Sequence, residues 1–232
     1  MLEQIKKNTV EANNQLVPSE YISFAGLDNS GLRIMFVGNS ITLHGIKEDI
    51  GWYHAWGMAA SAKEKDYVHL CFSRIREQYP ETAFCICQAA QWEMNYKNGE
   101  STYSLFESAR NFNADIIVMR IVENCPFPEY NKEEFKKCFS DFVTYLNPDG
   151  HAKVIITNGF WKHPADEAIE EYAKQNQLPF IDLGDLGEQE EMKAIGLFEH
   201  GGVANHPGDL GMEHIASRIC DVLLNQVLGE NK

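Results

Sequence analysis

The sequence contains no apolar run that approaches the length of a transmembrane helix. Residues 1–14 are polar and lack the apolar region of a signal peptide. These two absences predict a cytoplasmic protein for the chain as it stands. The alternative is a secreted or periplasmic protein from which a leader has been removed.

An excess of positive charge is also absent. Lysine and arginine together number 20, aspartate and glutamate 34, and the formal net charge is −14. This balance argues against nucleic acid or an anionic membrane surface as a partner. A neutral ester or a sugar is compatible with it. The oligomeric state is left open.

The cysteines do not show the spacing of a zinc site. They lie mostly in apolar stretches, at Cys71, Cys85, Cys87, Cys125, Cys138 and Cys220. Buried free thiols are therefore expected. Cys125 follows one of the candidate site stretches described below, so a catalytic cysteine is a minor alternative.

What the sequence does contain is an alternation of strand and helix patterns, repeated about five times across 232 residues. Strands are predicted over 32–37, 82–87, 114–120, 153–157 and 179–183, and helices over 66–79, 103–112, 131–146, 164–176, 187–195 and 209–228. No internal repeat, low-complexity segment or linker interrupts them. The pattern predicts one α/β domain with a parallel sheet over 32–232. Residues 1–31 form an N-terminal extension packing on it, in which 21–24 are a candidate edge strand.

The chain is organised around the end of the first predicted strand. The apolar run Leu32–Val37 leads into Gly38-Asn39-Ser40. Ligands of open α/β sheets bind at the carboxyl ends of strands, so Ser40 stands where a substrate can reach it. Taken alone, Gly-Asn-Ser favours a simple turn over a catalytic serine.

A second polar stretch near the other end of the chain changes this interpretation. Asn205-His206-Pro207 precedes a turn and the start of the last helix. A serine early and a histidine late, both at element ends, are what a Ser-His hydrolase requires. His214, inside the last helix, is interpreted as structural.

Together these stretches resemble the SGNH/GDSL hydrolases. The first is similar to the family's Gly-Asp-Ser block, with Asn39 in place of Asp, and the last to its His block. A third block, Ile116–Asn124, lies between them in the expected order. The resemblance implies a three-layer α/β/α sandwich with a mainly parallel, five-stranded, flavodoxin-like sheet. It also implies acyl transfer to water, with Ser40 as nucleophile, His206 as base, and no metal or organic cofactor.

The oxyanion hole implied by the resemblance has three donors. They are the backbone N–H of Ser40, the side-chain amide of Asn124 and a backbone N–H after the second strand. By offset, the family's glycine in that strand's block falls near Glu93, or next to it at Trp92, and is missing here. Since the donor is a backbone group, the N–H of Trp92 or Glu93 can still serve, and Glu93 is the residue named as the predicted donor. Its side chain either faces the pocket or is a solvated charge.

The acid that the family places three residues before the histidine is missing as well, because Val203 occupies that position. A nearby backbone carbonyl, such as that of Val203, is the first explanation and gives a Ser-His dyad. The second is a carboxylate from elsewhere, with Glu199 or Asp182 as candidates. The third is a weak or inactive site.

Four tryptophans near the predicted site suggest a carbohydrate substrate, because indole rings stack on sugar faces. Together with Asn39, the predicted substrate-binding residues are Trp52, Trp56, Trp92 and Trp161. For each tryptophan the alternative is a place in the core. The predicted function is a serine esterase that removes a small acyl group, such as acetyl, from a carbohydrate or similar small substrate. An acyltransferase and a non-catalytic ligand-binding domain on the same fold are the alternatives.

Overall fold

The computed structural model describes residues 16–28, 31–128 and 130–229. At its centre is a six-stranded sheet in the order β1-β3-β2-β4-β5-β6. The strands are β1 (Ile22–Ala25), β2 (Arg33–Gly38), β3 (Ala83–Gln88), β4 (Ile116–Met119), β5 (Lys153–Thr157) and β6 (Phe180–Ile181). All neighbouring pairs are parallel except β1 with β3. The predicted mainly parallel α/β fold is confirmed, with the candidate edge strand as its sixth member.

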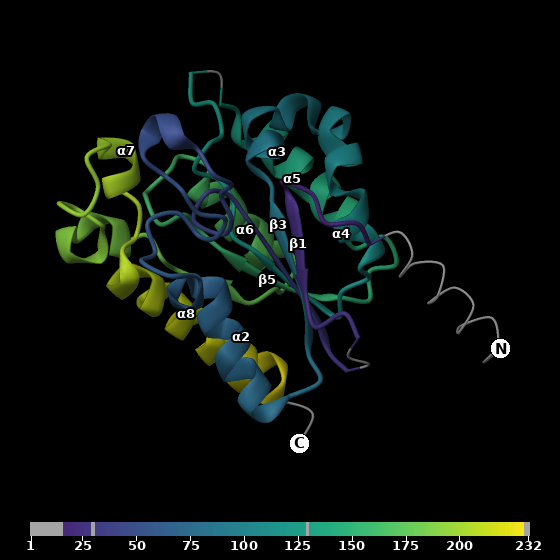
Figure 1. Cartoon of the computed structure of the whole chain (residues 1–232). Helices are drawn as coiled ribbons and strands as arrows, with labels where there is room; N and C mark the ends of the chain where they lie inside the picture. The colour runs from purple at the N-terminus through teal and green to yellow at the C-terminus, as the bar shows by residue number, and fades with distance from the viewer. Residues whose placement is uncertain (1–15, 29–30, 129, 230–232) are drawn as a thin grey trace.

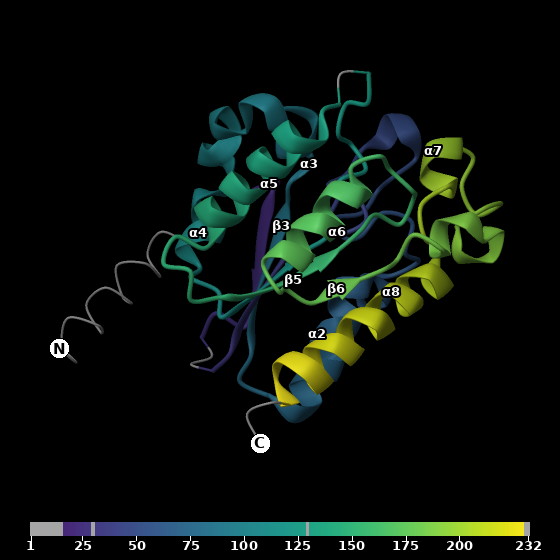
Figure 2. The same cartoon turned by 180° about the vertical axis from the view of Figure 1, so that it is seen from behind.

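Helices cover both faces of this sheet, as predicted (Figure 1, Figure 2). Helices α2 (Tyr67–Gln78) and α8 (Asp209–Val222) lie side by side on one face. The other face carries α3 (Ala90–Met94), α4 (Glu107–Asn111), α5 (Lys132–Leu146) and α6 (Asp166–Gln175). Between α3 and α4 lies the 3-10 segment η3 (Tyr96–Phe106). Shorter pieces are α7 (Gly201–Ala204), the 3-10 turns η1 (Glu48–Ile50) and η2 (Lys63–Lys65), and a π-helical turn η6 (Leu223–Val227).

Strand β2 shows why the central strands are apolar throughout. Ile34 and Phe36 pack with the helices α2 and α8, whereas Met35 and Val37 face the opposite layer. Successive side chains of a strand point to opposite faces, and here both faces are covered. All four side chains are fully buried. An alternating apolar and polar pattern would leave one layer without a partner.

Local sequence signals set the ends of several helices. The Asp66 side chain accepts the His69 N–H at 2.8 Å and caps α2, and Asn131 accepts the Glu134 N–H at 2.9 Å before α5. The predicted helix over 187–195 is wrong. Two separate 3-10 turns, η4 (Leu186–Glu188) and η5 (Glu190–Met192), stand there instead, because Gln189 between them has an extended backbone.

The sheet order creates the place for a site. From β2 the chain continues to β3 on one side, and β4 then lies on the other side of β2. The connections therefore diverge at the carboxyl ends of β2 and β4, which is where open α/β sheets bind ligands. Ser40 follows β2 and Asn124 follows β4. The boundary at residue 31 stays a prediction. Residues 1–15, 29 and 30 of the predicted N-terminal extension lie outside the described residues.

Within the described ranges, no helix is both long enough and apolar enough to cross a bilayer.

Candidate active site

Ser40 and His206 meet although 166 positions separate them in the chain. The Ser40 Oγ lies 2.8 Å from Nε2 of His206, which stands between α7 and α8. The other ring nitrogen, Nδ1, lies 2.7 Å from the carbonyl oxygen of Gly202. A carbonyl oxygen only accepts hydrogen bonds, so Nδ1 carries the proton in the neutral ring. Nε2 is then free to accept the proton of the serine hydroxyl.

The surroundings of His206 keep its imidazole neutral. Burial lowers its pKa to about 4, although the hydrogen bond to Gly202 and the negative charge of Glu123 act in the opposite direction. The indole of Trp161 packs edge-on against the imidazole, with ring centroids 5.1 Å apart. At neutral pH the histidine is therefore in the form that a general base needs.

A backbone carbonyl thus occupies the position of the missing acid, and it belongs to Gly202 and not to Val203. The two candidate carboxylates are elsewhere. Glu199 is exposed, and Asp182 accepts hydrogen bonds from Asn158 Nδ2 at 2.6 Å and from the Gly184 N–H at 2.9 Å. The geometry is that of a Ser-His dyad held by the main chain.

We expect Asp182→Asn and Glu199→Gln each to change kcat/KM for 4-nitrophenyl acetate by no more than about threefold. Neither carboxylate contacts the His206 ring, so its orientation does not depend on them. Loss of an acid that does hold the ring costs on the order of 10⁴-fold in a Ser-His-Asp triad. Steady-state kinetics at pH 8 measure the difference. A loss of 10³-fold in either variant would contradict the dyad.

Ser40, His206 and Asn124 line one cavity of about 410 Å³. Ala90 and Gln91, at the start of α3, line it as well. The Asn124 amide Nδ2 donates one hydrogen bond, of 2.5 Å, to the buried carboxyl of Glu93. An amide nitrogen carries two hydrogens, which leaves the second for a group in the cavity.

The predicted oxyanion donor at Glu93 is wrong. The backbone N–H of Glu93 lies inside α3 and donates to the Ala89 carbonyl at 3.0 Å, so it is not offered to a substrate. The Glu93 side chain is neither solvated nor in the pocket, because it is completely buried. Of residues 88–93, which follow or end β3, the ones that line the cavity are Gln88, Ala90 and Gln91.

Asn39 is also wrongly predicted, as a substrate-binding residue. Its side chain is 1% exposed and all its polar positions are used inside the protein. Nδ2 donates to Glu93 at 3.0 Å and to Glu123 at 2.5 Å, while Oδ1 accepts from Arg120 at 2.5 Å. Asn39 therefore braces the turn that carries Ser40.

The tryptophans are distributed differently from the prediction. Trp52 and Trp92 are fully buried, Trp92 being stacked on Phe142 with centroids 4.7 Å apart, so neither binds substrate. Trp56 is partly buried and donates its indole N–H to the Ala60 carbonyl, outside the cavity lining. Of the four indole rings, only that of Trp161 packs against the His206 ring. Trp52 and Trp92 are therefore core residues, which was the alternative stated for each tryptophan.

Sequence reasoning missed a buried ion pair beneath the serine. Arg120 is completely buried at the end of β4 and donates to Glu123 Oε1 at 2.7 Å. The guanidinium also lies over the Tyr67 ring. A single arginine closing an otherwise apolar strand was the available signal, because a buried charge requires a partner nearby.

The alternative of a catalytic cysteine loses its physical basis. Cys125 is buried, and burial together with the nearby carboxylates of Glu93 and Glu123 raises the pKa of its thiol far above the ordinary value. The thiolate is the reactive form of cysteine, and here it is disfavoured. Among the described residues, no cluster of His, Cys, Asp and Glu has the arrangement of a metal site.

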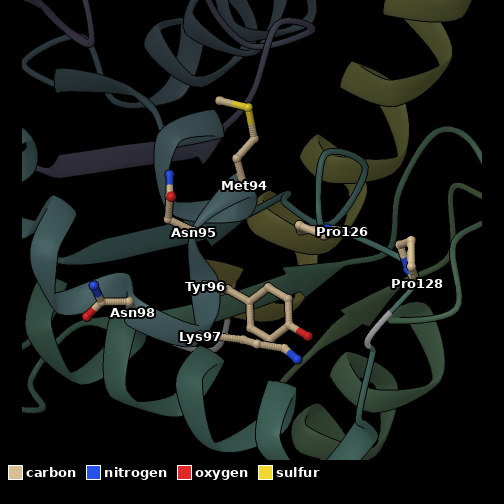
Figure 3. A pocket seen from close by; sticks show the side chains of 7 residues that line it. All are labelled: Met94, Asn95, Tyr96, Lys97, Asn98, Pro126 and Pro128. Atoms are coloured by element: carbon tan, nitrogen blue, oxygen red, sulfur yellow. The ribbon is translucent and has the colours of Figure 1, made fainter.

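A second hollow, of about 420 Å³, adjoins the Ser40 cavity, and Met94 lines both. Figure 3 shows it between the segment Met94–Asn98 and the two prolines Pro126 and Pro128. Its surface is mostly apolar, with Asn95, Lys97 and Asn98 as its polar lining residues. The two hollows together provide room for more than a small acyl group.

The fold of the chain is similar to that of several solved structures. No family model matches the chain, and no curated protein matches it. A two-domain esterase active on acetylated mannans, crystallised with mannopentaose, aligns with 98% of this chain at a TM-score of 0.56 and 17% identity. A family two carbohydrate esterase from Cellvibrio japonicus aligns with 87% at 0.55 and 14% identity. Another, from Clostridium thermocellum in complex with cellohexaose, aligns with 84% at 0.51 and 11% identity.

The chain has the fold of these esterases. The fold expected from the resemblance to SGNH/GDSL hydrolases is thereby confirmed. The alignments cover 55%, 62% and 64% of the three esterases, so the chain spans roughly half to two thirds of their length.

Proposed function

We propose that this protein is a serine esterase that releases a small acyl group, such as acetyl, from a carbohydrate ester. The observation that carries the proposal is the chain of two contacts from Ser40 through His206 to the Gly202 carbonyl. It combines a nucleophile, a base and a group that orients the base, at the carboxyl edge of a parallel sheet.

In the proposed reaction, Ser40 Oγ attacks the ester carbonyl while its proton moves to Nε2 of His206. Negative charge develops on the carbonyl oxygen, and the Ser40 N–H and the free hydrogen of Asn124 Nδ2 stabilise it. A backbone N–H at the start of α3, near Ala90 and Gln91, is the proposed third donor. The imidazolium then returns its proton to the leaving alcohol, and water repeats the sequence on the acyl-enzyme.

The dyad sets a limit on the rate. A carboxylate stabilises the imidazolium that forms during attack, whereas the Gly202 carbonyl offers only a dipole. The negative charge of Glu123 supplies part of the stabilisation of the imidazolium that a triad carboxylate would give, since it acts to raise the pKa of His206. A modest kcat on simple esters is therefore expected.

Three features support a carbohydrate ester as the substrate. Esterases of this fold act on acetylated mannans or were crystallised with oligosaccharides. The adjoining hollow combines the polar residues Asn95 and Asn98 with the apolar surface of Met94 and the prolines. This mixture suits a sugar ring, which has apolar faces and a polar rim. The net charge of −14 favours a neutral glycan over a polyanionic one.

Acetate release from acetylated manno-oligosaccharides tests the proposal. Wild-type protein is expected to release acetate from the oligosaccharide, while Ser40→Ala is expected to release none above background. Acetylated xylo-oligosaccharides and 4-nitrophenyl acetate run in parallel separate glycan preference from general esterase activity. If no acetylated sugar is hydrolysed but 4-nitrophenyl acetate is, the carbohydrate part of the proposal is wrong. If acetyl groups pass to added sugar alcohols faster than to water, the protein is an acyltransferase.

A further inference from the structure

Beneath Ser40 lies a polar network, of which the proposed reaction uses only the Asn124 amide and the charge of Glu123. It comprises Asn39 after β2, Glu93 on α3, and Arg120, Glu123 and Asn124 after β4. Asn39, Glu93 and Arg120 are at most 1% exposed, and the side chain of Glu123 is 4% exposed. Burying charges is costly, and apolar residues of similar size would stabilise the fold as well or better. A network of this kind therefore invites a functional explanation.

Within this network Glu93 joins the nucleophile turn to the oxyanion donor. Its Oε1 accepts the Asn39 amide at 3.0 Å and the backbone N–H of Val122 at 2.6 Å. Its Oε2 accepts the Asn124 amide at 2.5 Å. All three bonds run toward the carboxyl group, so Glu93 acts only as an acceptor. A single rigid side chain on a helix thus sets the relative position of the Ser40 turn and Asn124.

The bond to Asn124 has a geometric consequence. One hydrogen of Nδ2 is fixed on Glu93, and the planar amide then holds the other at a defined direction in the cavity that Ser40 lines. Without an acceptor at Glu93 Oε2, the exposed Asn124 side chain rotates and loses this direction. Preorganised donors stabilise an oxyanion better than donors that must reorganise.

We propose that the ionised carboxylate of Glu93 is a positioning residue that aims the Asn124 amide at the developing oxyanion, so that its protonation turns the esterase down. The proposal rests on the proposed function. The three donors occupy three of the four lone-pair positions of the carboxylate, and the position left for a proton is on Oε2, beside the Asn124 bond. Protonation there weakens the Asn124 bond, because a neutral hydroxyl oxygen is a poorer acceptor than a carboxylate oxygen.

The charges around Glu93 place this switch near neutrality. Among the described residues, the charged or titratable groups that face it are Glu123, Arg120 and Cys125. Burial and the charge of Glu123 raise the pKa of Glu93 to about 7, although the hydrogen bonds from Asn124, Asn39 and Val122 act to lower it. The carboxylate is present above that pKa and disappears as the pH falls through it. Activity should therefore rise with pH through about 7, well above the pKa of about 4 for His206.

The pH dependence of kcat/KM for 4-nitrophenyl acetate between pH 5 and 9 tests the proposal. Wild-type protein is expected to show an acid limb near pH 7. Glu93→Gln is expected to lose this limb, and to reduce kcat at pH 8 by roughly 10- to 100-fold, which is less than the 10²–10³-fold cost of removing an oxyanion donor. KM should change little. Glu170→Gln, an exposed glutamate on α6, is the matched control and should keep the wild-type profile.

The pH profile of Asn124→Ala tests the same proposal without relying on the folding of Glu93→Gln. If Glu93 acts through Asn124, Asn124→Ala alone loses the limb near pH 7, and the double variant is no slower than Asn124→Ala. A limb that persists in Asn124→Ala, or losses that multiply in the double variant, would overturn the proposal. Fluorophosphonate labelling of Ser40 distinguishes a failure of the proposed esterase function from a failure of the proposed role of Glu93. Wild type that is not labelled refutes the esterase itself, whereas labelled wild type without the limb refutes only the role of Glu93.

Discussion

Replacing Ser40 with alanine is expected to reduce kcat/KM for 4-nitrophenyl acetate by roughly 10³-fold or more. The Ser40 Oγ is the nucleophile of the proposed reaction, and it lies in hydrogen-bond contact with His206. His206→Ala should cost a similar factor, because an unassisted serine hydroxyl is a weak nucleophile. Rates at pH 8, with the melting temperature of each variant as a check on folding, measure both effects.

The double variant gives the sharper result. When two groups act as one unit, removing the second costs little more than removing the first. Ser40→Ala/His206→Ala should therefore be about as slow as either single variant. Ser101→Ala, at an exposed serine whose hydroxyl donates to the Asn98 carbonyl, is the control and should retain full activity. Independent, multiplying losses would show that the 2.8 Å contact is not a catalytic pair.

Arg120→Met is expected to destabilise the protein by about 3–5 kcal/mol, the usual cost of leaving a buried charge without its partner. The guanidinium is completely buried and bonds to Glu123 at 2.7 Å and Asn39 at 2.5 Å. Without it, two buried carboxyl groups face each other with no positive charge between them. Urea denaturation at pH 8 measures the loss in the free energy of unfolding.

Two comparisons make this result specific. Arg218→Met removes an exposed ion pair with Asp185 and should cost about 1 kcal/mol or less. The loss in Arg120→Met should also shrink on going from pH 8 to pH 5, because Glu93, whose pKa is already raised to about 7, is then protonated. A cost for Arg120→Met no larger than that for Arg218→Met would contradict the view that Arg120 compensates the charge of the buried carboxyl groups of Glu93 and Glu123.

The parts of the fold that follow local rules could be predicted from the sequence. Apolar runs such as Leu32–Val37 marked the central strands, because strands buried on both faces are continuously apolar. Asp66 and Asn131 marked helix starts, because their side chains cap free N–H groups. The pairing of Ser40 with His206 followed from element ends and from the resemblance to a family. The 187–195 segment failed because its acidic pattern does not distinguish one helix from two 3-10 turns.

The surroundings of the site could not be predicted, since they depend on contacts between distant segments. Glu93 and Arg120 are joined through Asn39 and Glu123 only after β2, β4 and α3 come together. Nothing local in the sequence distinguishes a buried glutamate from a solvated one. Likewise, Trp92 follows a strand end as a pocket residue would, yet its helix turns the indole into the core against Phe142.

Intact mass spectrometry after incubation with a fluorophosphonate tests the central claim most directly. This probe phosphonylates a serine hydroxyl only when the serine is activated. The structure predicts one adduct on wild-type protein, none on Ser40→Ala, and much slower labelling of His206→Ala. An adduct that persists in Ser40→Ala, or no adduct on folded wild-type protein, would contradict the claim that Ser40 and His206 form an esterase dyad.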